Sequence, residues 1–254
     1  MSDDAEARAF IGAAIVCAIL AGCAAPAPRP SLWRMSDIAN SYAPTVRLQD
    51  AKKIVVGTID PATARSVTEV KKRIETAAGL VGSELFVAAG DEPNAFSADT
   101  AIGRIVAVNV AMLDLIGRDM DGYASVLGHE YAHLSLNHRS ARTDREHTRR
   151  AASHVLGIVL SVAGLPMGGT IASVGTTAIE RTYTRDEERD ADKLGLYYMV
   201  KAGYDPQGAI RVWKKMSERS RSSSIPFLAT HPSSSERLKT LAEMADPARA
   251  GGEP

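Results

Sequence analysis

The stretch Gly128-His129-Glu130-Tyr131-Ala132-His133 decides how the rest of this 254-residue sequence is interpreted. On a helix, residues four apart lie on one face, so His129 and His133 could bind one divalent metal ion. This spacing suits zinc, and Glu130 would lie about 100° further round the helix, where it could take a proton from an attacking water. A core helix that carries two histidines would show the same short pattern. The flanking residues must therefore distinguish a metal site from an ordinary core helix.

These flanking residues favour a buried helix. Asp119 or Asp121 can cap its start, because a short side-chain oxygen accepts a hydrogen bond from the free backbone N–H groups of the first turn. The helix itself is mostly apolar, with Val126, Leu127, Leu134 and Leu136. Two histidines leave zinc in need of a third protein ligand, next to a position for water. We expect that ligand to be a carboxylate from another helix.

Residues 185–202 offer this second helix, and they contain five carboxylates from which periodicity has to select one. At 100° per residue, the side of the helix that carries Glu188 is small and apolar, whereas Asp186 and Asp190 lie on the opposite side with the lysines. The small and apolar residues are Ala191, Gly195, Met199 and Ala202. Glu188 is therefore predicted as the third ligand. Asp192, one turn on, could accept the second ring N–H of a zinc-bound histidine.

Five motifs, two of which contain the predicted metal ligands, follow one another along the sequence. They are Pro93-Asn94-Ala95-Phe96, Val126 to Glu130 with His133 and His138, Tyr183-Thr184-Arg185 before Glu188 and Asp192, Ala202 to Pro206, and Thr230-His231-Pro232 with Arg237. With them, residues 54–244 resemble the membrane-associated gluzincins that include the CAAX prenyl endopeptidase and the HtpX-type and BepA-type proteases, which form family forty-eight of the metallopeptidases. The resemblance implies an α+β fold, a mostly helical zincin domain with a small β-sheet that lines the active-site cleft.

The resemblance also implies roles for individual residues. His129, His133 and Glu188 would hold one zinc ion per chain, and Glu130 would be the general base of peptide hydrolysis. His231 becomes a second catalytic candidate at the rim of the site, either as a hydrogen-bond donor or as a reversible plug on the zinc. A lone histidine before a proline is otherwise usually structural.

The substrate cleft is expected beside a strand. Residues 103–109, which include Val106 and Val108, have the apolar character of a sheet strand, and in this family such a strand offers its free edge to an extended substrate. From the residues alone, an ordinary interior strand is the better interpretation. Asn94, Ala95 and Phe96 are similar to the family segment that shapes the cleft wall.

The N-terminus resembles a bacterial lipoprotein signal. The apolar run 10–20 is too short to span a membrane and ends in Leu20-Ala21-Gly22-Cys23, which looks like a processing and lipidation site. We expect a signal peptide at 1–22, lipidated Cys23 with a proline-rich tether to residue 30, and one protease domain at 31–254. The acids before the run are unusual for a signal and would fit a misassigned translation start. The alternative to a signal peptide is an uncleaved short anchor or an ordinary apolar helix. Ala24 after the cysteine favours the periplasmic face of the outer membrane.

Charge excludes one class of partner. The chain carries 30 basic and 30 acidic residues, and removal of residues 1–22 would leave a small positive balance. This gives no reason to expect nucleic acid as a partner. Residues 155–179 are apolar but contain a proline and several glycines, which favours a short hairpin over a transmembrane helix.

Other elements follow from local signals. A helix is expected from Pro61 to Gly79, strands at 84–88 and 102–110 with turn residues 91–94 between them, a helix at 207–220, a flexible loop at 222–226 and a helix that starts near Pro232. Residues 31–53 are uninformative.

Two functions fit these expectations. The first is a zinc endopeptidase that cleaves misfolded or misassembled envelope proteins in an extended conformation, attached to the membrane through its lipid. The second is a chaperone-like assembly factor for outer-membrane proteins, in contact with the assembly machinery, that uses the same cleft with little proteolysis.

Overall fold

We analysed the fold in a computed structural model, which describes residues 32–50, 52–100, 103–137, 183–221, 224–231 and 235–249. The expected signal peptide, Cys23 with its tether, His138 and the apolar segment 155–179 lie outside these residues. The domain boundaries at residues 22 and 30 therefore stay predictions.

Helix α4 (Met120–Ser135) lies at the centre of the described part of the chain, and all residues from Gly122 to Leu134 are buried. The Asp119 side chain caps it by accepting a hydrogen bond from the Gly122 N–H at 3.0 Å, so Asp119 is the cap of the two predicted candidates. Helix α2 (Pro61–Ala78) packs beside α4. It begins after Asp60, which accepts from the Thr63 N–H, and ends at Gly79 with a φ of 69°, as predicted.

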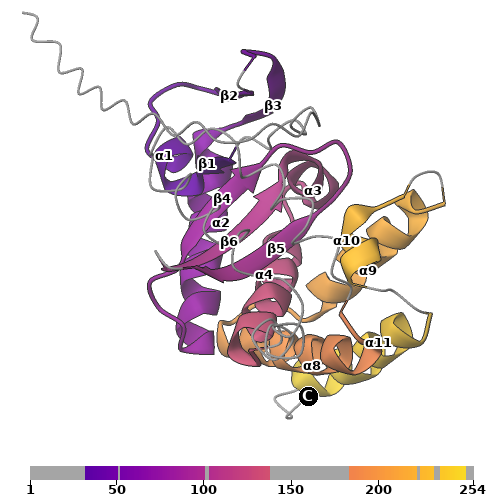
Figure 1. The fold of residues 1–254 in the computed structure, drawn as a ribbon. Coiled ribbons are helices and arrows are strands. Elements are labelled where there is room, and N and C mark those ends of the chain that lie inside the picture. Colours follow the sequence, from indigo (N-terminus) through magenta and orange to yellow (C-terminus); the bar gives the residue numbers. More distant parts are fainter. Residues whose placement is uncertain are drawn as a thin grey trace, which may run out of the picture.

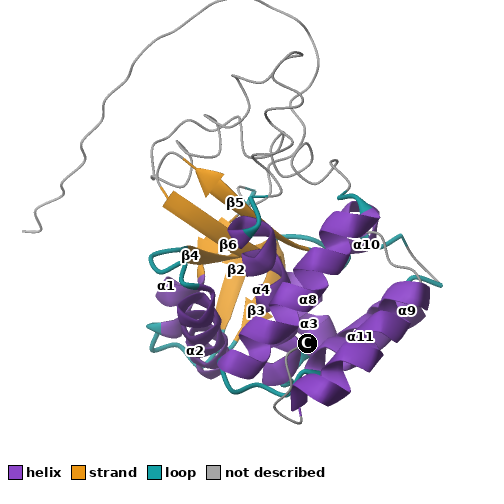
Figure 2. Cartoon of the chain, turned by 90° about the horizontal axis from the view of Figure 1, so that it is seen from below, coloured by secondary structure: helices purple, strands orange, loops and turns teal. Residues whose placement is uncertain are grey.

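A four-stranded sheet lies on one side of α4 (Figures 1 and 2). Its strands, in spatial order, are β1 (Leu32–Arg34), β4 (Glu84–Ala88), β6 (Gly103–Asn109) and β5 (Ala95–Thr100). β4 and β6 are parallel, and the other two pairs are antiparallel. Side chains alternate between the faces: Val87 and Val106 belong to the main core with α2 and α4, whereas Phe86 and Ile105 belong to a smaller cluster on the opposite face.

The expectation of a free edge on residues 103–109 is wrong. β6 pairs with β4 on one side and with β5 on the other, and Val106 and Val108 are wholly buried in the main core. The continuous apolar run of β6 is explained by this position, because a strand that is buried on both faces needs apolar side chains on both. Within the described residues the edge strands of this sheet are β1 and β5, and β5 was not predicted from the sequence.

Helices α8 (Arg185–Lys201) and α9 (Gln207–Arg219) also pack on α4, and α11 (Ser235–Arg249) packs on both α8 and α9. Helix α3 (Val110–Ile116) follows β6 directly and contacts β6 and α9, and the short helix α10 (Pro226–Thr230) lies between α9 and α11 in the sequence. A capping box between Thr184 and Glu187 starts α8. Part of the predicted loop 222–226 is ordered, because Ile225 is buried and Pro226 begins α10. Among the helices of the described residues, none is long and apolar enough to cross a membrane.

Residues 35–59 contain three elements that the sequence did not indicate. Helix α1 (Met35–Ala39) packs on α2, and strands β2 (Val46–Gln49) and β3 (Val55–Ile59) form a separate antiparallel pair. This pair stands at the end of the molecule that also holds β1, whereas α8 lies at the opposite end (Figure 1).

Candidate metal centre and active site

The site forms where α4 and α8 meet along their small residues. The carbonyl oxygen of Gly195 lies 2.9 Å from the position that a Cβ on Gly128 would take. Gly195 is one of the small residues predicted on the Glu188 side of α8, and Gly128 is the matching residue on α4. Because the backbones are this close, the side chains of His129 and Glu188 reach one another across the contact.

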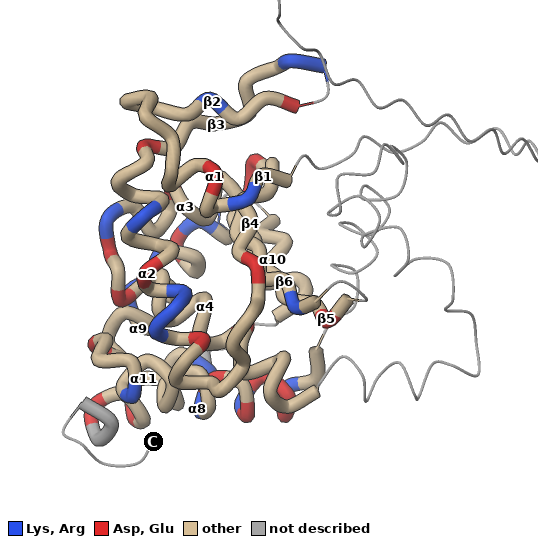
Figure 3. The backbone as a smooth tube through the Cα atoms, turned by 90° about the vertical axis from the view of Figure 1, so that its left-hand side faces the viewer, with Lys and Arg blue, Asp and Glu red and all other residues tan. Residues whose placement is uncertain are grey.

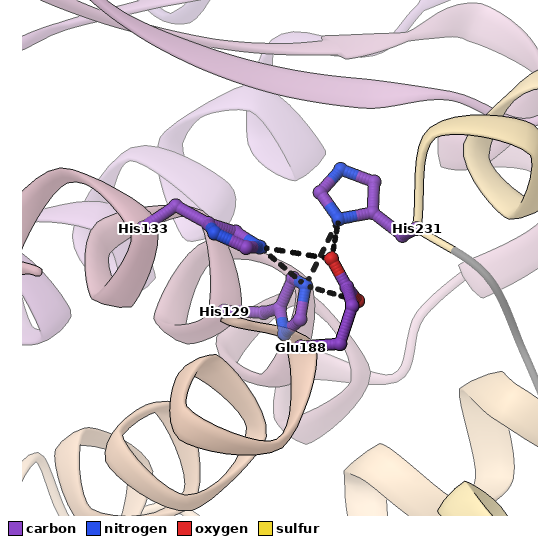
Figure 4. A group of neighbouring side chains, drawn as sticks. All are labelled: His129, His133, Glu188 and His231. Carbon is purple, nitrogen blue, oxygen red and sulfur yellow. Dashed lines mark hydrogen bonds and ion pairs between the residues drawn. The ribbon is translucent and has the colours of Figure 1, made fainter. Parts of the chain in front are cut away.

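Four buried side chains converge there: His129, His133, Glu188 and His231 (Figure 4). Each offers one ligand atom, and these atoms all lie within 4.8 Å of one another. The Nε2 atoms of His129 and His133 are 3.1 Å apart, and the His231 Nδ1 lies 3.2 Å from the His129 Nε2. The Glu188 Oε1 lies 2.9 Å from the His231 Nδ1 and 3.3 Å from the His133 Nε2.

This donor set fits a zinc ion. Bonds of about 2.0–2.1 Å in a tetrahedron place neighbouring ligand atoms roughly 3.3 Å apart, close to the separations in this cluster. Imidazole nitrogen and carboxylate oxygen are also the donors that zinc takes in catalytic sites. His231 is the fourth member, and at 2% exposure it lies inside the cluster rather than at a solvent-exposed rim.

Glu130 lies beside this cluster with an unusual environment. Its side chain is wholly buried, and neither carboxylate oxygen has a hydrogen-bond partner among the described residues. The His231 Nε2 lies 3.4 Å from one of these oxygens. A buried carboxylate without hydrogen bonds is costly, so such a group points to a function rather than to stability. The backbone of Glu130, in contrast to its side chain, has a polar partner outside its helix. The Ser97 hydroxyl of β5 donates a hydrogen bond to the Glu130 carbonyl at 3.0 Å.

Asp192 contacts the other ring nitrogen of His129, as the periodicity predicted. Its Oδ1 lies 3.1 Å from the His129 Nδ1. Burial lowers the pKa of His129, but the carboxylates of Glu188 and Asp192 outweigh burial and raise that pKa to about 9. Because Asp192 is placed to accept the Nδ1–H, the Nε2 atom of His129 is the one that faces the cluster.

Arg237 of α11 contacts both buried carboxylates of α8, those of Glu188 and Asp192. Its guanidinium forms a bidentate ion pair with Asp192 and a further ion pair with Glu188, and it stacks over the Trp213 ring at 4.2 Å. Burial raises the pKa of Asp192, but Arg237 and His129 outweigh it and hold that pKa below its ordinary value. Arg237 was part of a family motif, but no role was predicted for it. It stands alone in a polar segment, so no spacing to another residue indicated a function.

Two aromatic rings stack on histidines of the site, and neither contact was predicted from the sequence. Tyr183 stacks on His133 with ring centroids 3.8 Å apart, and Phe227 stacks on His231 at 4.4 Å. The Phe227 N–H also donates to the Pro93 carbonyl at 3.3 Å, which ties α10 to the chain just before β5.

The predicted cleft residues divide into three groups. Asn94 and Ala95 are buried at the start of β5, and the Asn94 Oδ1 has no hydrogen-bond partner among the described residues. Phe96 packs on the face of the sheet that points away from the main core. Val106 and Val108 are buried in that core. Asp186 is exposed on the outer side of α8, as predicted, with Asp190.

A His-Glu-x-x-His helix that faces a glutamate helix defines the gluzincin class of metallopeptidases. The comparison with known families agrees, because residues 61–245 match Peptidase family M48. The chain belongs to this family, whose members are metal-dependent peptidases.

Individual relatives resemble the chain at moderate identity. The Beta-barrel assembly-enhancing protease of Escherichia coli (strain K12) is 27% identical over 200 residues, which are 75% of this chain and 40% of that protein. The Mitochondrial metalloendopeptidase OMA1 of Schizosaccharomyces pombe is 31% identical over 182 residues, 70% of this chain and 51% of that protein. The chain thus matches about half of the length of these relatives, or less.

Proposed function

We propose that this chain is a zinc-dependent endopeptidase that cleaves misfolded or misassembled proteins of the bacterial envelope. The observation that carries the proposal is the convergence of four buried ligand atoms next to a buried carboxylate without hydrogen bonds. His129, His133 and Glu188 would hold one zinc ion, and the ring of His231 would take the fourth position in a resting state.

The chemistry divides between the metal and the protein. When bound, zinc would lower the pKa of a water molecule and polarise the peptide carbonyl. Glu130 would accept the proton from the attacking water and return it to the leaving amine, and its two oxygens need break no hydrogen bond with the described residues to do so. Asp192 fixes the tautomer of His129 by accepting its Nδ1–H, while Arg237 balances the charge of Asp192 and Glu188.

An extended substrate would bind along β5. This strand is the edge of the sheet nearest α4, and its Ser97 contacts the backbone of Glu130, so a segment paired with it would pass the metal cluster. Main-chain hydrogen bonds to an edge strand recognise a peptide without regard to its sequence. This suits a protease of unfolded chains. Asn94, with a side-chain oxygen that has no partner among the described residues, would accept a hydrogen bond from the substrate.

We further propose that the protein is attached by a lipid on Cys23 to the periplasmic face of the outer membrane. The sequence Leu20-Ala21-Gly22-Cys23 and the name of the bacterial relatives, which refers to β-barrel assembly, support this location. Cys23→Ser should abolish fatty-acid labelling and leave a longer precursor, whereas Cys17→Ser should change neither. A soluble, unlabelled parent protein would overturn the location.

The activity is tested with purified protein and an unfolded protein substrate. We expect cleavage that stops after chelation, returns with zinc, and is lost in Glu130→Gln at unchanged zinc content. A Glu130→Gln variant that cleaves like the parent would exclude Glu130 as the base.

The second candidate is a chaperone-like role in outer-membrane assembly, which the word "assembly-enhancing" in the relatives' name favours. Complementation of a deletion strain separates the two functions. A holding role survives Glu130→Gln, whereas a proteolytic role does not. Proteins that accumulate on Glu130→Gln would identify the substrates.

A further inference from the structure

The β2–β3 hairpin carries an apolar and basic end far from the metal centre. Ile54 and Val55 are 58% and 47% exposed, the only two neighbouring residues among the large apolar side chains that are exposed in the described part of the chain. Lys52 and Lys53 precede them and are exposed as well. The hairpin stands away from the main sheet, and basic residues mark its end (Figure 3).

Hydrogen bonds hold this end in a fixed conformation. One oxygen of the Asp50 side chain accepts from the backbone N–H groups of Lys52 and Ile54, both at 2.8 Å. The Asp50 and Ile54 backbones are joined at 2.9 Å, and the Lys53 N–H donates to the Asp50 carbonyl. Lys53 has a φ of 66°, which non-glycine residues adopt rarely. The backbone of the turn is therefore held in place, and strain of this kind gathers where a protein has a function.

The charge of the hairpin indicates what it contacts. Residues 46–59 contain three basic side chains, Arg47, Lys52 and Lys53, and a single acid, Asp50, whose side chain is occupied within the turn. Two aliphatic side chains are too few for a stable protein–protein interface, and lysine is depleted in such interfaces. At a lipid surface the same combination is favourable, because aliphatic groups enter the acyl boundary while lysines reach the phosphates.

We propose that the end of the hairpin, defined as Lys52, Lys53, Ile54 and Val55, rests on the surface of a membrane that contains anionic phospholipids. The contact is independent of the proposed peptidase activity. Its geometry has a consequence for the site, because the hairpin and α8 lie at opposite ends of the molecule (Figures 1 and 3). A membrane at the hairpin leaves the helix that carries Glu188 on the side away from the bilayer.

The position of the hairpin can be measured directly in the full chain. Ile54→Trp places a fluorophore at the hairpin end, and Val81→Trp places one at another exposed aliphatic residue, 72% exposed in the connection between α2 and β4. With vesicles of phosphatidylglycerol and phosphatidylcholine whose acyl chains are brominated, quenching beyond that of the parent is expected for Ile54→Trp and not for Val81→Trp. Equal quenching of the two variants would overturn the proposal.

Binding affinity gives the second measurement. Lys52→Glu with Lys53→Glu should weaken binding to anionic vesicles by at least fivefold per lysine, a ratio that matches roughly 1 kcal/mol for each basic residue near such a surface. The same pair should not change binding to pure phosphatidylcholine. Lys239→Glu, at a side chain that is 77% exposed on α11, is the matched control. Any further attachment through residues outside the hairpin is common to all variants.

A protein partner is the competing occupant. If Ile54→Ser with Val55→Ser leaves vesicle binding as in the parent but dissociates a dimer of the chain, the surface is a protein interface and the membrane proposal is wrong. Because all four side chains are exposed, the melting temperature of each variant should equal that of the parent.

Discussion

The backbones of α4 and α8 touch at His129 and Gly195: a Cβ added to Gly195 would lie 3.0 Å from the His129 amide nitrogen and 3.1 Å from its Cα. Neither atom belongs to a flexible side chain, so the two helices would have to separate. This contact fixes the distance between the predicted ligands of the two helices, and it makes a glycine necessary inside a helix that propensity alone would disfavour.

Gly195→Ala therefore tests the contact. Helix propensity alone predicts stabilisation by about 1 kcal/mol, whereas the contact predicts destabilisation by about 1–3 kcal/mol and weaker zinc binding. Thermal unfolding and a zinc titration give the two readouts. An unchanged or higher melting temperature with full zinc affinity would show that the helices do not meet in this way.

The choice of the third ligand is tested by Glu188→Ala and Asp186→Ala. The Glu188 side chain is buried among three histidines, whereas that of Asp186, two residues earlier, is 80% exposed. We expect about one zinc per chain in the parent and in Asp186→Ala, and none after dialysis in Glu188→Ala or His129→Ala. Metal analysis of purified protein provides the measurement. Full zinc in Glu188→Ala would exclude Glu188 as a ligand.

Arg237 is expected to stabilise the site more than any exposed arginine does. Arg237→Met leaves Asp192 and Glu188 buried without their guanidinium partner, and removal of one member of a buried ion pair costs about 3–5 kcal/mol. Arg189→Met, the control, breaks an exposed pair with Asp186 on α8, which contributes about 1 kcal/mol or less. Denaturant unfolding of the two variants should differ accordingly, and equal losses would contradict a special role of Arg237.

Glu75 gives the fold a predictable dependence on pH. Burial raises the pKa of Glu75, but hydrogen bonds from Lys71 and Ser83, at 2.8 Å and 2.6 Å, outweigh burial and lower it below 4.5. Because the pKa in the folded state is the lower one, the stabilisation is present above the unfolded value and is lost as the pH falls through the folded value. The free energy of unfolding of the parent should therefore decrease as the pH falls below about 4.5.

Glu75→Gln removes this dependence. The difference in unfolding free energy between parent and variant should be largest near neutral pH, about 1–3 kcal/mol, and should shrink as the pH falls below 4.5. Glu69→Gln, at an exposed position of the same helix, should change stability at neutral pH by less than about 0.5 kcal/mol. A constant difference between parent and Glu75→Gln from pH 3 to 7 would contradict the hydrogen-bonded state of Glu75.

The sequence predicted best those features that depend on residues close together along the chain. The spacing of His129 and His133, the buried side of α8 and the helix start at Pro61 each depend on residues within a single helix, and the structure agrees with each. Strand β5 was missed because Ser97 and Asp99 are poor strand formers, and its formation depends on pairing with β6 and on contact with α4. The same limit applies to long-range contacts. Nothing near Arg237 in the sequence indicates Asp192, 45 residues away.

His231 is the residue whose role the geometry makes most testable. Its Nδ1 lies among the ligand atoms, its Nε2 faces Glu130, and its ring is stacked on Phe227, so it occupies space that substrate and water need. If His231 plugs the site, it must leave before cleavage begins. His231→Ala should then raise basal cleavage of an unfolded protein at unchanged zinc content. The alternative role as a donor to the oxyanion predicts the opposite, a fall in kcat on the order of 10²-fold or more. Unchanged kinetics with a lower melting temperature would mean that the ring only packs. Steady-state kinetics and zinc content of this one variant therefore distinguish the three roles, and we expect the rise in basal cleavage, because a histidine buried with its nitrogen 2.9 Å from the Glu188 carboxylate blocks the position that water would take.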